Sequence, residues 1–277
     1  MTQPSKNILH AVICVLLSIV LCALSACGSS TARVPSTVAL TVEGMGVSKT
    51  LTASDLNTLK QYQALYTAVN NWPSKKQYAA AGVSINSILS SLKVSPKTIS
   101  FVSRDGYKVA LTADQLTQTR YTFAGGTRTP VEPILAYQYA TDATSLSALK
   151  PQKTLTLLFG QLTATEATNP AFVEDVTKII LSDQVETWPA PEIFPSAAIV
   201  SAGGTVKLTH PAEGLVKIYY TLDGTEPTLD SKLYNPSTYQ PELNKPIPVT
   251  QDTTIKAIAY GYGKQTSTVA TFSVKVR

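Results

Sequence analysis

The sequence predicts a chain of two domains, an α+β domain with short helices followed by an all-β sandwich. Residues 36–187 mix hairpin patterns with short helix patterns, whereas residues 196–277 contain strand patterns only. A proline-rich stretch, residues 188–195, lies between them. Because prolines stiffen the chain and remove ladder donors, we interpret this stretch as an inter-domain linker.

The first domain is expected to open with a hairpin. Residues 37–51 alternate apolar and polar on both sides of Gly44-Met45-Gly46, which is typical of two paired strands. Thr52 and Asp55 form a capping-box-like pattern, with Asp in place of the usual Glu, and predict a short helix after the hairpin. Residues 61–69 are predicted to form the next strand.

Residues 84–92 carry the clearest helix pattern, with apolar residues at spacings of three and four and Ser84 as N-cap. Residues 99–111 predict a hairpin, with Asp105-Gly106 as a type I′ turn. The remaining predicted elements of this domain are a short helix from Thr112 and strands over 134–139 and 154–159, and the segment 170–182 ends in the mostly apolar run of residues 176–181.

The second domain is predicted from short strand patterns separated by turn residues every 8–12 residues, which is typical of a β-sandwich. The five predicted strands are residues 205–209, 216–221, 247–250, 253–259 and 267–276.

The N-terminus predicts export and a lipid anchor. Lys6 is followed by an apolar run over residues 11–24, too short to span a bilayer as a helix. Leu24-Ser25-Ala26-Cys27 resembles the lipobox of bacterial lipoproteins, in which the Cys is diacylated and becomes the first mature residue. We therefore expect residues 1–26 to be a signal peptide and residues 27–35 a lipidated tether facing the extracytoplasmic side of the membrane. The alternative is an ordinary signal or an uncleaved anchor with an incidental Cys.

Composition excludes several classes of function. The net charge of +5 is carried without a Lys/Arg run, so we expect no nucleic-acid partner. If residues 1–26 are removed, Cys27 and His210 are the only Cys and His left. A disulfide, a Cys-based zinc site and a His-rich metal site are then excluded. We interpret His210, next to Pro211, as an exposed loop residue.

The order of motifs over residues 35–185 resembles the molybdopterin-binding domain of the sulfite oxidase family. The resemblance rests on the opening hairpin, the helix after Gly82-Val83-Ser84, the Ser103-x-Asp105-Gly106-Tyr107 turn and Leu158-Phe159-Gly160-Gln161. It implies a mixed sheet with short helices.

The same family binds molybdenum through a Cys between the tyrosine-bearing strand and the Gly-Val helix, and residues 66–72 contain none. Thiolate ligation is therefore excluded, and we expect no cofactor and no metal. If the old cofactor cleft still holds a ligand, the candidate residues are Tyr66, Asn70, Trp72, Arg104 and Tyr107.

The second domain resembles the chitobiase/β-hexosaminidase C-terminal type, an Ig-like sandwich. Residues 218–228, with Asp223-Gly224-Thr225-Glu226-Pro227 as their turn, carry the resemblance together with Tyr234 and residues 253–259. Aromatic rings stack on sugars, so the candidate glycan contacts are Tyr220, Tyr234, Tyr239 and Tyr262. Core packing is the competing interpretation for these tyrosines.

No motif indicates a catalytic site, and Glu166, Glu174 and Asp175 are interpreted as a solvated acidic face. We expect a non-catalytic surface lipoprotein that binds a cell-envelope glycan or a surface protein. The alternatives are an oxidoreductase-like protein with a pterin-type cleft and a carbohydrate-binding accessory module for a separate glycosidase.

Overall fold

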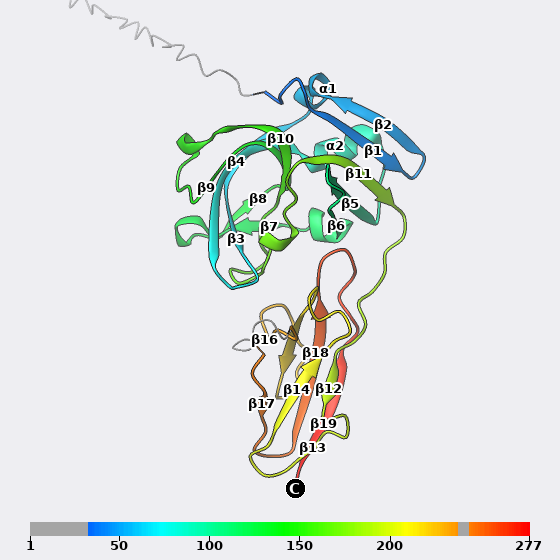
Figure 1. Ribbon diagram of the computed structural model, residues 1–277. Helices are drawn as coiled ribbons and strands as arrows, with labels where there is room; N and C mark the ends of the chain where they lie inside the picture. The colour runs from blue at the N-terminus through cyan, green and yellow to red at the C-terminus, as the bar shows by residue number, and fades with distance from the viewer. Residues whose placement is uncertain (1–32, 238–243) are drawn as a thin grey trace, which may run out of the picture. The chain divides into compact units, whose positions relative to one another are not determined.

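The computed structural model describes residues 33–237 and 244–277, which are mostly β-strands in several sheets with few helices (Figure 1). The strands before residue 187 and those after it form separate sheets. Their hydrophobic clusters are also separate, so each part has a core of its own. By their contacts, the described residues nevertheless belong to one compact unit.

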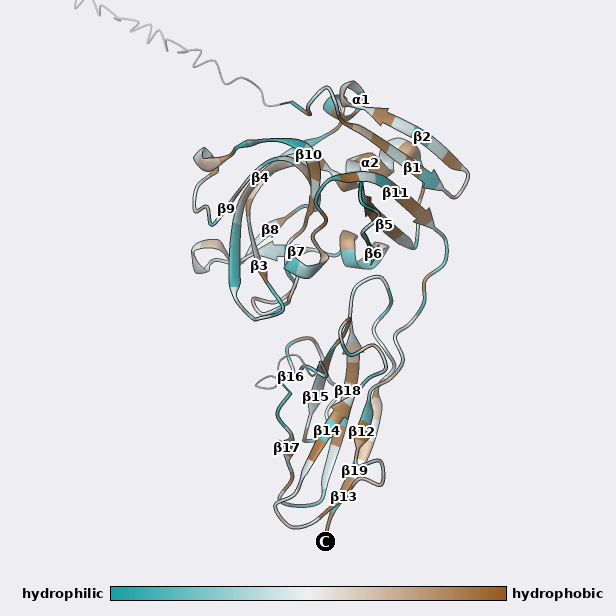
Figure 2. Ribbon diagram, in the orientation of Figure 1, coloured by the Kyte–Doolittle hydropathy of each residue, from teal (hydrophilic) through white to brown (hydrophobic). Residues whose placement is uncertain are grey.

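The first sheet has five strands. It is mixed, because β1 (Ala39–Gly44) and β11 (Val176–Ser182) run parallel while the other neighbouring strands are antiparallel. Leu40 and Val42 alternate with partly exposed residues along β1, and both are fully buried. Figure 2 shows a hydrophobic stretch along β11, the strand that pairs with β1. In order, the strands are β2 (Val47–Thr52), β1 (Ala39–Gly44), β11 (Val176–Ser182), β5 (Thr98–Ser103) and β6 (Lys108–Thr112).

Two of the three predicted capping signals are confirmed. Thr52 caps α1 (Ala53–Thr58) in a reciprocal capping box with Asp55, and Thr112 caps α3 (Ala113–Thr117) in the same way with Gln115. Ser84 precedes α2 (Ile85–Leu92) as predicted, but its side chain makes no capping bond. Its hydroxyl donates to the Glu132 carboxylate instead, at 2.9 Å.

The second sheet is antiparallel and was only partly predicted. Strands β3 and β9 match their predicted positions, whereas β4 was not predicted, because its Ala79-Ala80-Ala81-Gly82 run has low β-propensity. Pairing with β3 and β9 on both sides holds it in the sheet. In order, the strands are β10 (Pro151–Leu158), β9 (Ile134–Thr141), β4 (Lys75–Ser84) and β3 (Gln61–Val69).

The turn between β5 and β6 differs from the prediction. Gly106 is left-handed, with φ of 89°, but Asp105 is not among the residues with positive φ. A type I′ turn needs positive φ at both central residues, so this turn is of another type. The Gly106 amide donates to the Ser103 carbonyl, and the Ser103 amide donates to the Tyr107 carbonyl.

Short elements complete the first part. They are the two-stranded ribbon of β7 (Arg120–Thr122) and β8 (Thr129–Val131) and the 3₁₀ turns η1 (Ala124–Gly126), η2 (Leu146–Ala148) and η3 (Asn169–Ala171). No helix within residues 33–237 and 244–277 is long and apolar enough to cross a membrane.

The C-terminal part is a sandwich of two sheets. Val206 and Leu208 of one sheet share a buried cluster with Ile218 and Ile255 of the other, and Figure 2 shows the hydrophobic run along β18. One sheet contains β12 (Glu192–Phe194), β14 (Thr205–Thr209) and β17 (Ile247–Pro248); the other contains β13 (Ile199–Val200), β19 (Ala270–Val276), β18 (Thr253–Tyr260), β15 (Lys217–Thr221) and β16 (Lys232–Tyr234).

The interpretation of residues 188–195 as a linker was wrong in part. Strand β12 lies inside this stretch and pairs with β14. Trp188 is also buried, and it packs against Val216 and Ala259 of the sandwich. The prolines do not prevent this pairing, because β12 is an edge strand.

Candidate binding site

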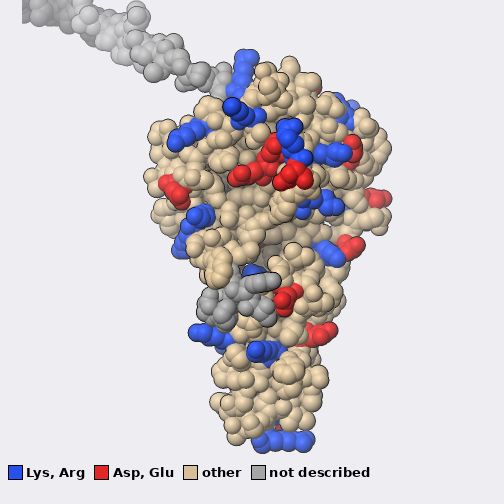
Figure 3. Space-filling model, in the orientation of Figure 1, with Lys and Arg blue, Asp and Glu red and all other residues tan. Residues whose placement is uncertain are grey.

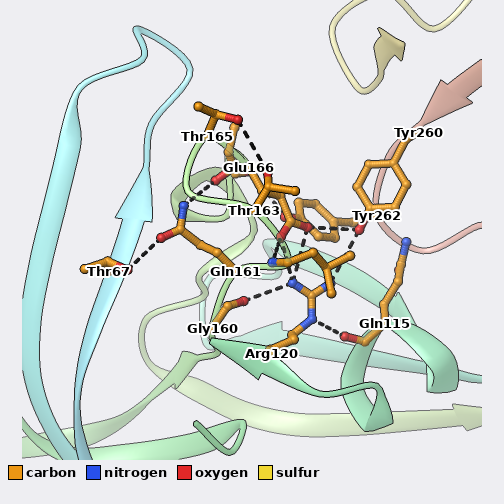
Figure 4. A network of polar contacts seen from close by, with 12 residues as sticks. Thr67, Gln115, Arg120, Gly160, Gln161, Thr163, Thr165, Glu166, Tyr260 and Tyr262 are labelled. Carbon is orange, nitrogen blue, oxygen red and sulfur yellow. Dashed lines mark hydrogen bonds and ion pairs between the residues drawn. The ribbon is translucent and has the colours of Figure 1, made fainter. Parts of the chain in front are cut away.

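A buried ion pair joins Arg120, at the start of β7, to Glu166, in the loop after β10. Their side chains are 0% and 3% exposed. Arg120 Nη1 lies 3.1 Å from Glu166 Oε2 and 3.2 Å from Oε1 (Figure 4). The guanidinium also donates to the carbonyls of Gln115 and Gly160. Such partners are required, because burying two charges is costly unless their remaining hydrogen-bonding groups are satisfied.

Tyr260, the last residue of β18, and Tyr262, two residues after it, complete this network. The Tyr260 and Tyr262 hydroxyls each donate to Glu166 Oε1, at 3.0 Å (Figure 4). Burial, with the negative charge of Glu166 second, raises the pKa of both hydroxyls. Both therefore stay protonated and act as hydrogen-bond donors at neutral pH.

Gln115 and Trp188 also hold the loop of residues 260–264, through hydrogen bonds to its backbone. Gln115 Nε2 donates to the Gly261 carbonyl at 2.8 Å, and the Gly263 amide donates to Gln115 Oε1 at 3.0 Å. The indole nitrogen of Trp188 donates to the same Gly261 carbonyl at 3.1 Å. A Cβ at Gly261 would lie 2.5 Å from the Leu215 carbonyl oxygen, so only glycine fits at this position.

Glu166 is fully occupied by these contacts. Its Oε1 accepts from Tyr260, Tyr262 and Arg120, and its Oε2 accepts from Arg120 and the Leu162 amide. A general base or nucleophile needs an oxygen that can reach a substrate. The carboxylate therefore acts in packing the loops together. The interpretation of Glu166 as part of a solvated face was wrong.

Beside this network lies a pocket of about 330 Å³, which we name the tyrosine pocket. Its lining is mainly apolar and aromatic, with Leu215 and Tyr107 exposed by 71% and 52% at its edge. Pockets with a few polar groups in an apolar lining are the usual form of small-ligand sites. The lining residues used below are Tyr107, Lys108, Trp188, Lys217, Tyr219 and Tyr262.

Strand alternation explains which side chains of β15 face this pocket. Lys217 and Tyr219 lie on one face of the strand, while Ile218 and Tyr220 face the sandwich core. Lys217 is paired directly with Tyr260 in the neighbouring strand. Sequence reasoning missed Lys217, because strand alternation does not show which face meets a pocket.

The structure does not bring the five cleft candidates together. Tyr66 is fully buried, and its hydroxyl donates to the Glu132 carbonyl. Arg104 pairs with Asp175 and is 72% exposed. Tyr107 alone lines the tyrosine pocket. Asn70 and Trp72 lie in the loop between β3 and β4, where Trp72 is 60% exposed.

The side chains available in the described part of the chain do not fit a molybdenum cofactor. Residues 33–237 and 244–277 contain no Cys, and they hold no cluster of three His, Cys, Asp or Glu side chains able to bind a metal. The Arg104 guanidinium is paired with the Asp175 carboxylate.

The four tyrosines predicted to contact a glycan lie in different environments. Tyr234 is buried in the sandwich core and presents no ring to a sugar, and the partly buried Tyr220 packs against the same core. Tyr262 lines the tyrosine pocket. Tyr239 lies outside the described residues, as does the predicted lipid anchor Cys27.

His210 was also interpreted wrongly. It is 5% exposed, and its ring bonds the Pro189 carbonyl and accepts from the Ala212 amide. These contacts hold the predicted linker against the sandwich.

A match to a family model supports the all-β assignment of the C-terminal part. Residues 206–274 match the family described as "Fn3 associated". A structure of fibronectin(III)-like modules of CbhA from Clostridium thermocellum is similar at 12% identity and a TM-score of 0.23, covering 77% of this chain and 95% of that one. No curated protein matches the chain.

Two further solved structures are similar over most of the chain. The sulfane dehydrogenase SoxCD from Paracoccus pantotrophus is similar at 10% identity and a TM-score of 0.36, covering 83% of this chain and 69% of that one. The structure of Rst D1-D2 has 13% identity and a TM-score of 0.25, covering 78% and 99%.

Proposed function

We propose that this protein is a non-catalytic, lipid-anchored binding protein of the cell envelope whose tyrosine pocket holds a glycan. The observation that carries the proposal is the pocket itself. It offers aromatic rings and hydroxyls, while the carboxylate beside it is fully occupied by Arg120, two tyrosines and a backbone amide. Such a site supports binding, and its carboxylate is not free to act as a general base.

The chemistry of the lining favours a sugar. Aromatic faces stack on the C–H faces of a sugar ring, and tyrosine hydroxyls bond to its hydroxyl groups. Tyr107 presents half of its surface to solvent at the pocket, and Trp188 lies in the lining. At about 330 Å³ the pocket is at the small end of ligand sites, so it suits one or two sugar rings.

For the N-terminal part we propose a fold related to the sulfite oxidase family, without that family's activity. The mixed sheet of β1, β11 and β5 supports it, and the donor set does not fit the family's cofactor. The chitobiase-type assignment of the sandwich is likewise proposed, with the Asp223–Thr225 turn contacts as its support.

Replacing Cys27 with Ser is expected to move the protein from the membrane fraction to the soluble fraction. Two acyl chains would be lost, and each buried methylene contributes about 0.8 kcal/mol to membrane binding. The measurement is fractionation of cells that express the two forms, with a Ser29→Ala variant as the matched control. Membrane retention of the Cys27→Ser protein would contradict the anchor.

The binding proposal is tested by co-sedimentation of the detergent-solubilised full chain with insoluble cell wall, chitin and cellulose. We expect pelleting with at least one polymer, and we expect Tyr107→Ala to weaken it about tenfold, as the loss of a stacked aromatic implies. Phe194→Ala is the matched control, because Phe194 is 65% exposed but lies outside the pocket. No pelleting with any polymer would favour a protein partner.

A further inference from the structure

Two lysines of the tyrosine pocket have no negative partner. Lys108 and Lys217 both line the pocket, and neither forms an ion pair within the described part of the chain. Glu166 cannot serve them, because its charge is balanced by Arg120 at 3.1 Å. The pocket therefore has a surplus of positive charge.

Lys217 is the more informative of the two. It is partly buried, and its ammonium donates to the neutral Asn235 Oδ1 at 3.0 Å. An ammonium carries three donors, so this bond leaves others for a ligand. Burial lowers the pKa of Lys217, which is the expected effect on a cation taken from water without a counter-ion.

Tyr219 adds a second polar group on the same face of β15. Its side chain is 6% exposed, and its hydroxyl has no hydrogen-bond partner among the residues the structure describes. Two positions apart on a strand, Lys217 and Tyr219 point the same way into the pocket. The pocket lining therefore contains an ammonium-bearing and a hydroxyl-bearing side chain on the same face of one strand.

We infer that the tyrosine pocket recognises a sugar ring that carries an anionic substituent, with Lys217 and Tyr219 binding the anion and the aromatic lining holding the ring. This inference rests on the proposed glycan-binding function and narrows it to acidic glycans. A carboxylate or a phosphate would satisfy the same donors, since both are compact anions that accept charge-assisted hydrogen bonds.

Other lysines on the described surface also lack an ion pair, Lys207 among them, but Lys108 and Lys217 line a pocket. On the face shown in Figure 3, acidic and basic side chains are interspersed. Lys60, Lys178, Lys256, Lys264 and Lys275 each pair with a carboxylate. The pocket lysines differ from these because the only carboxylate in the pocket lining already has a cation.

The test compares matched sugars by ligand-observed NMR on the detergent-solubilised full chain. The pairs are glucuronic acid with glucose and galacturonic acid with galactose, and glucose 6-phosphate and galactose 6-phosphate test phosphate as the source of the anion. We expect at least one acidic sugar to bind about tenfold more tightly than its neutral counterpart, as expected for a charge-assisted hydrogen bond. Whether the uronic acids or the phosphates bind identifies the anion.

Variants connect the effect to the pocket. Lys217→Met should remove the preference for the acidic sugar, Lys217→Arg should keep most of it, and the exposed Lys207→Met should change nothing. Thermal unfolding verifies that each variant is folded. Equal affinity for acidic and neutral sugars, or equal affinity of Lys217→Met and the original protein for the acid, would overturn the inference and leave the glycan-binding proposal standing. Failure of every sugar to bind would also overturn it, and polymer pelleting then decides the broader proposal separately.

Discussion

Replacing Glu166 with Gln is expected to lower the free energy of unfolding by about 3–5 kcal/mol. The substitution leaves the Arg120 guanidinium buried, at 0% side-chain exposure, without a negative partner. Burial disfavours this cation, but Glu166 and the two tyrosines outweigh the effect and raise the pKa of Arg120. Arginine is not deprotonated in proteins, so the charge stays on Arg120 when Glu166 is replaced. Urea unfolding followed by circular dichroism measures the loss.

Glu43→Gln is the matched control for this prediction. Glu43 pairs with Lys178 at 3.1 Å, but both side chains remain well exposed, at 44% and 39%. Solvent screening reduces such surface pairs to about 0–1 kcal/mol, so this variant should change stability little. Equal losses from Glu166→Gln and Glu43→Gln would show that the buried pair contributes nothing special. The double variant Arg120→Met/Glu166→Leu should recover much of the loss, because no unpaired charge remains buried.

Replacing Gly261 with Ala is expected to destabilise the protein by about 1–3 kcal/mol, the usual range for overpacking a filled site. The added methyl group would lie 2.5 Å from the Leu215 carbonyl oxygen and 3.1 Å from the Trp188 indole. The 260–264 loop would have to move, which would break the bonds from Gln115 and Trp188 to the Gly261 carbonyl. Thermal unfolding measures the loss.

Fluorescence reports the local change. The chain has two tryptophans, and in a Trp72→Phe background the emission comes from Trp188 alone. Trp188 is 7% exposed, so we expect its emission to shift to longer wavelength in Gly261→Ala. Gly214→Ala is the matched control, because Gly214 lines the same pocket and a Cβ there meets no atom within 4 Å. An unshifted spectrum in Gly261→Ala would contradict the tight fit at this glycine.

Local signals predicted the elements that local chemistry controls. The capping pairs Thr52 with Asp55 and Thr112 with Gln115 are satisfied within four consecutive residues, and both appear as predicted. Strand β4 was not predicted, because it is held in the sheet by pairing with β3 and β9 and not by its own sequence pattern. Its Gly82 is required by the close approach of β9, since a Cβ at this position would lie 2.2 Å from the Leu135 carbonyl oxygen.

In the candidate site, too, the local sequence does not show which contacts a residue makes with distant segments. An aromatic residue looks alike in sequence whether it faces a core or a pocket, so Tyr234 and Tyr262 were given one role and have two. Glu166 looked solvated because its partner, Arg120, is 46 residues away in sequence and Tyr260 is 94 residues away.

The sequence by itself determined the all-β character of the C-terminal part and the short capped helices of the first part, because alternation and capping act over a few residues. It also supplies the lipobox-like Leu24-Ser25-Ala26-Cys27, which remains a prediction. Only the tertiary structure decided that Arg120, Glu166, Tyr260 and Tyr262 share one buried network, and that Lys217 faces a pocket without a counter-ion. The physical reason is that burial, pairing and desolvation arise from contacts between distant segments, and no local pattern records them.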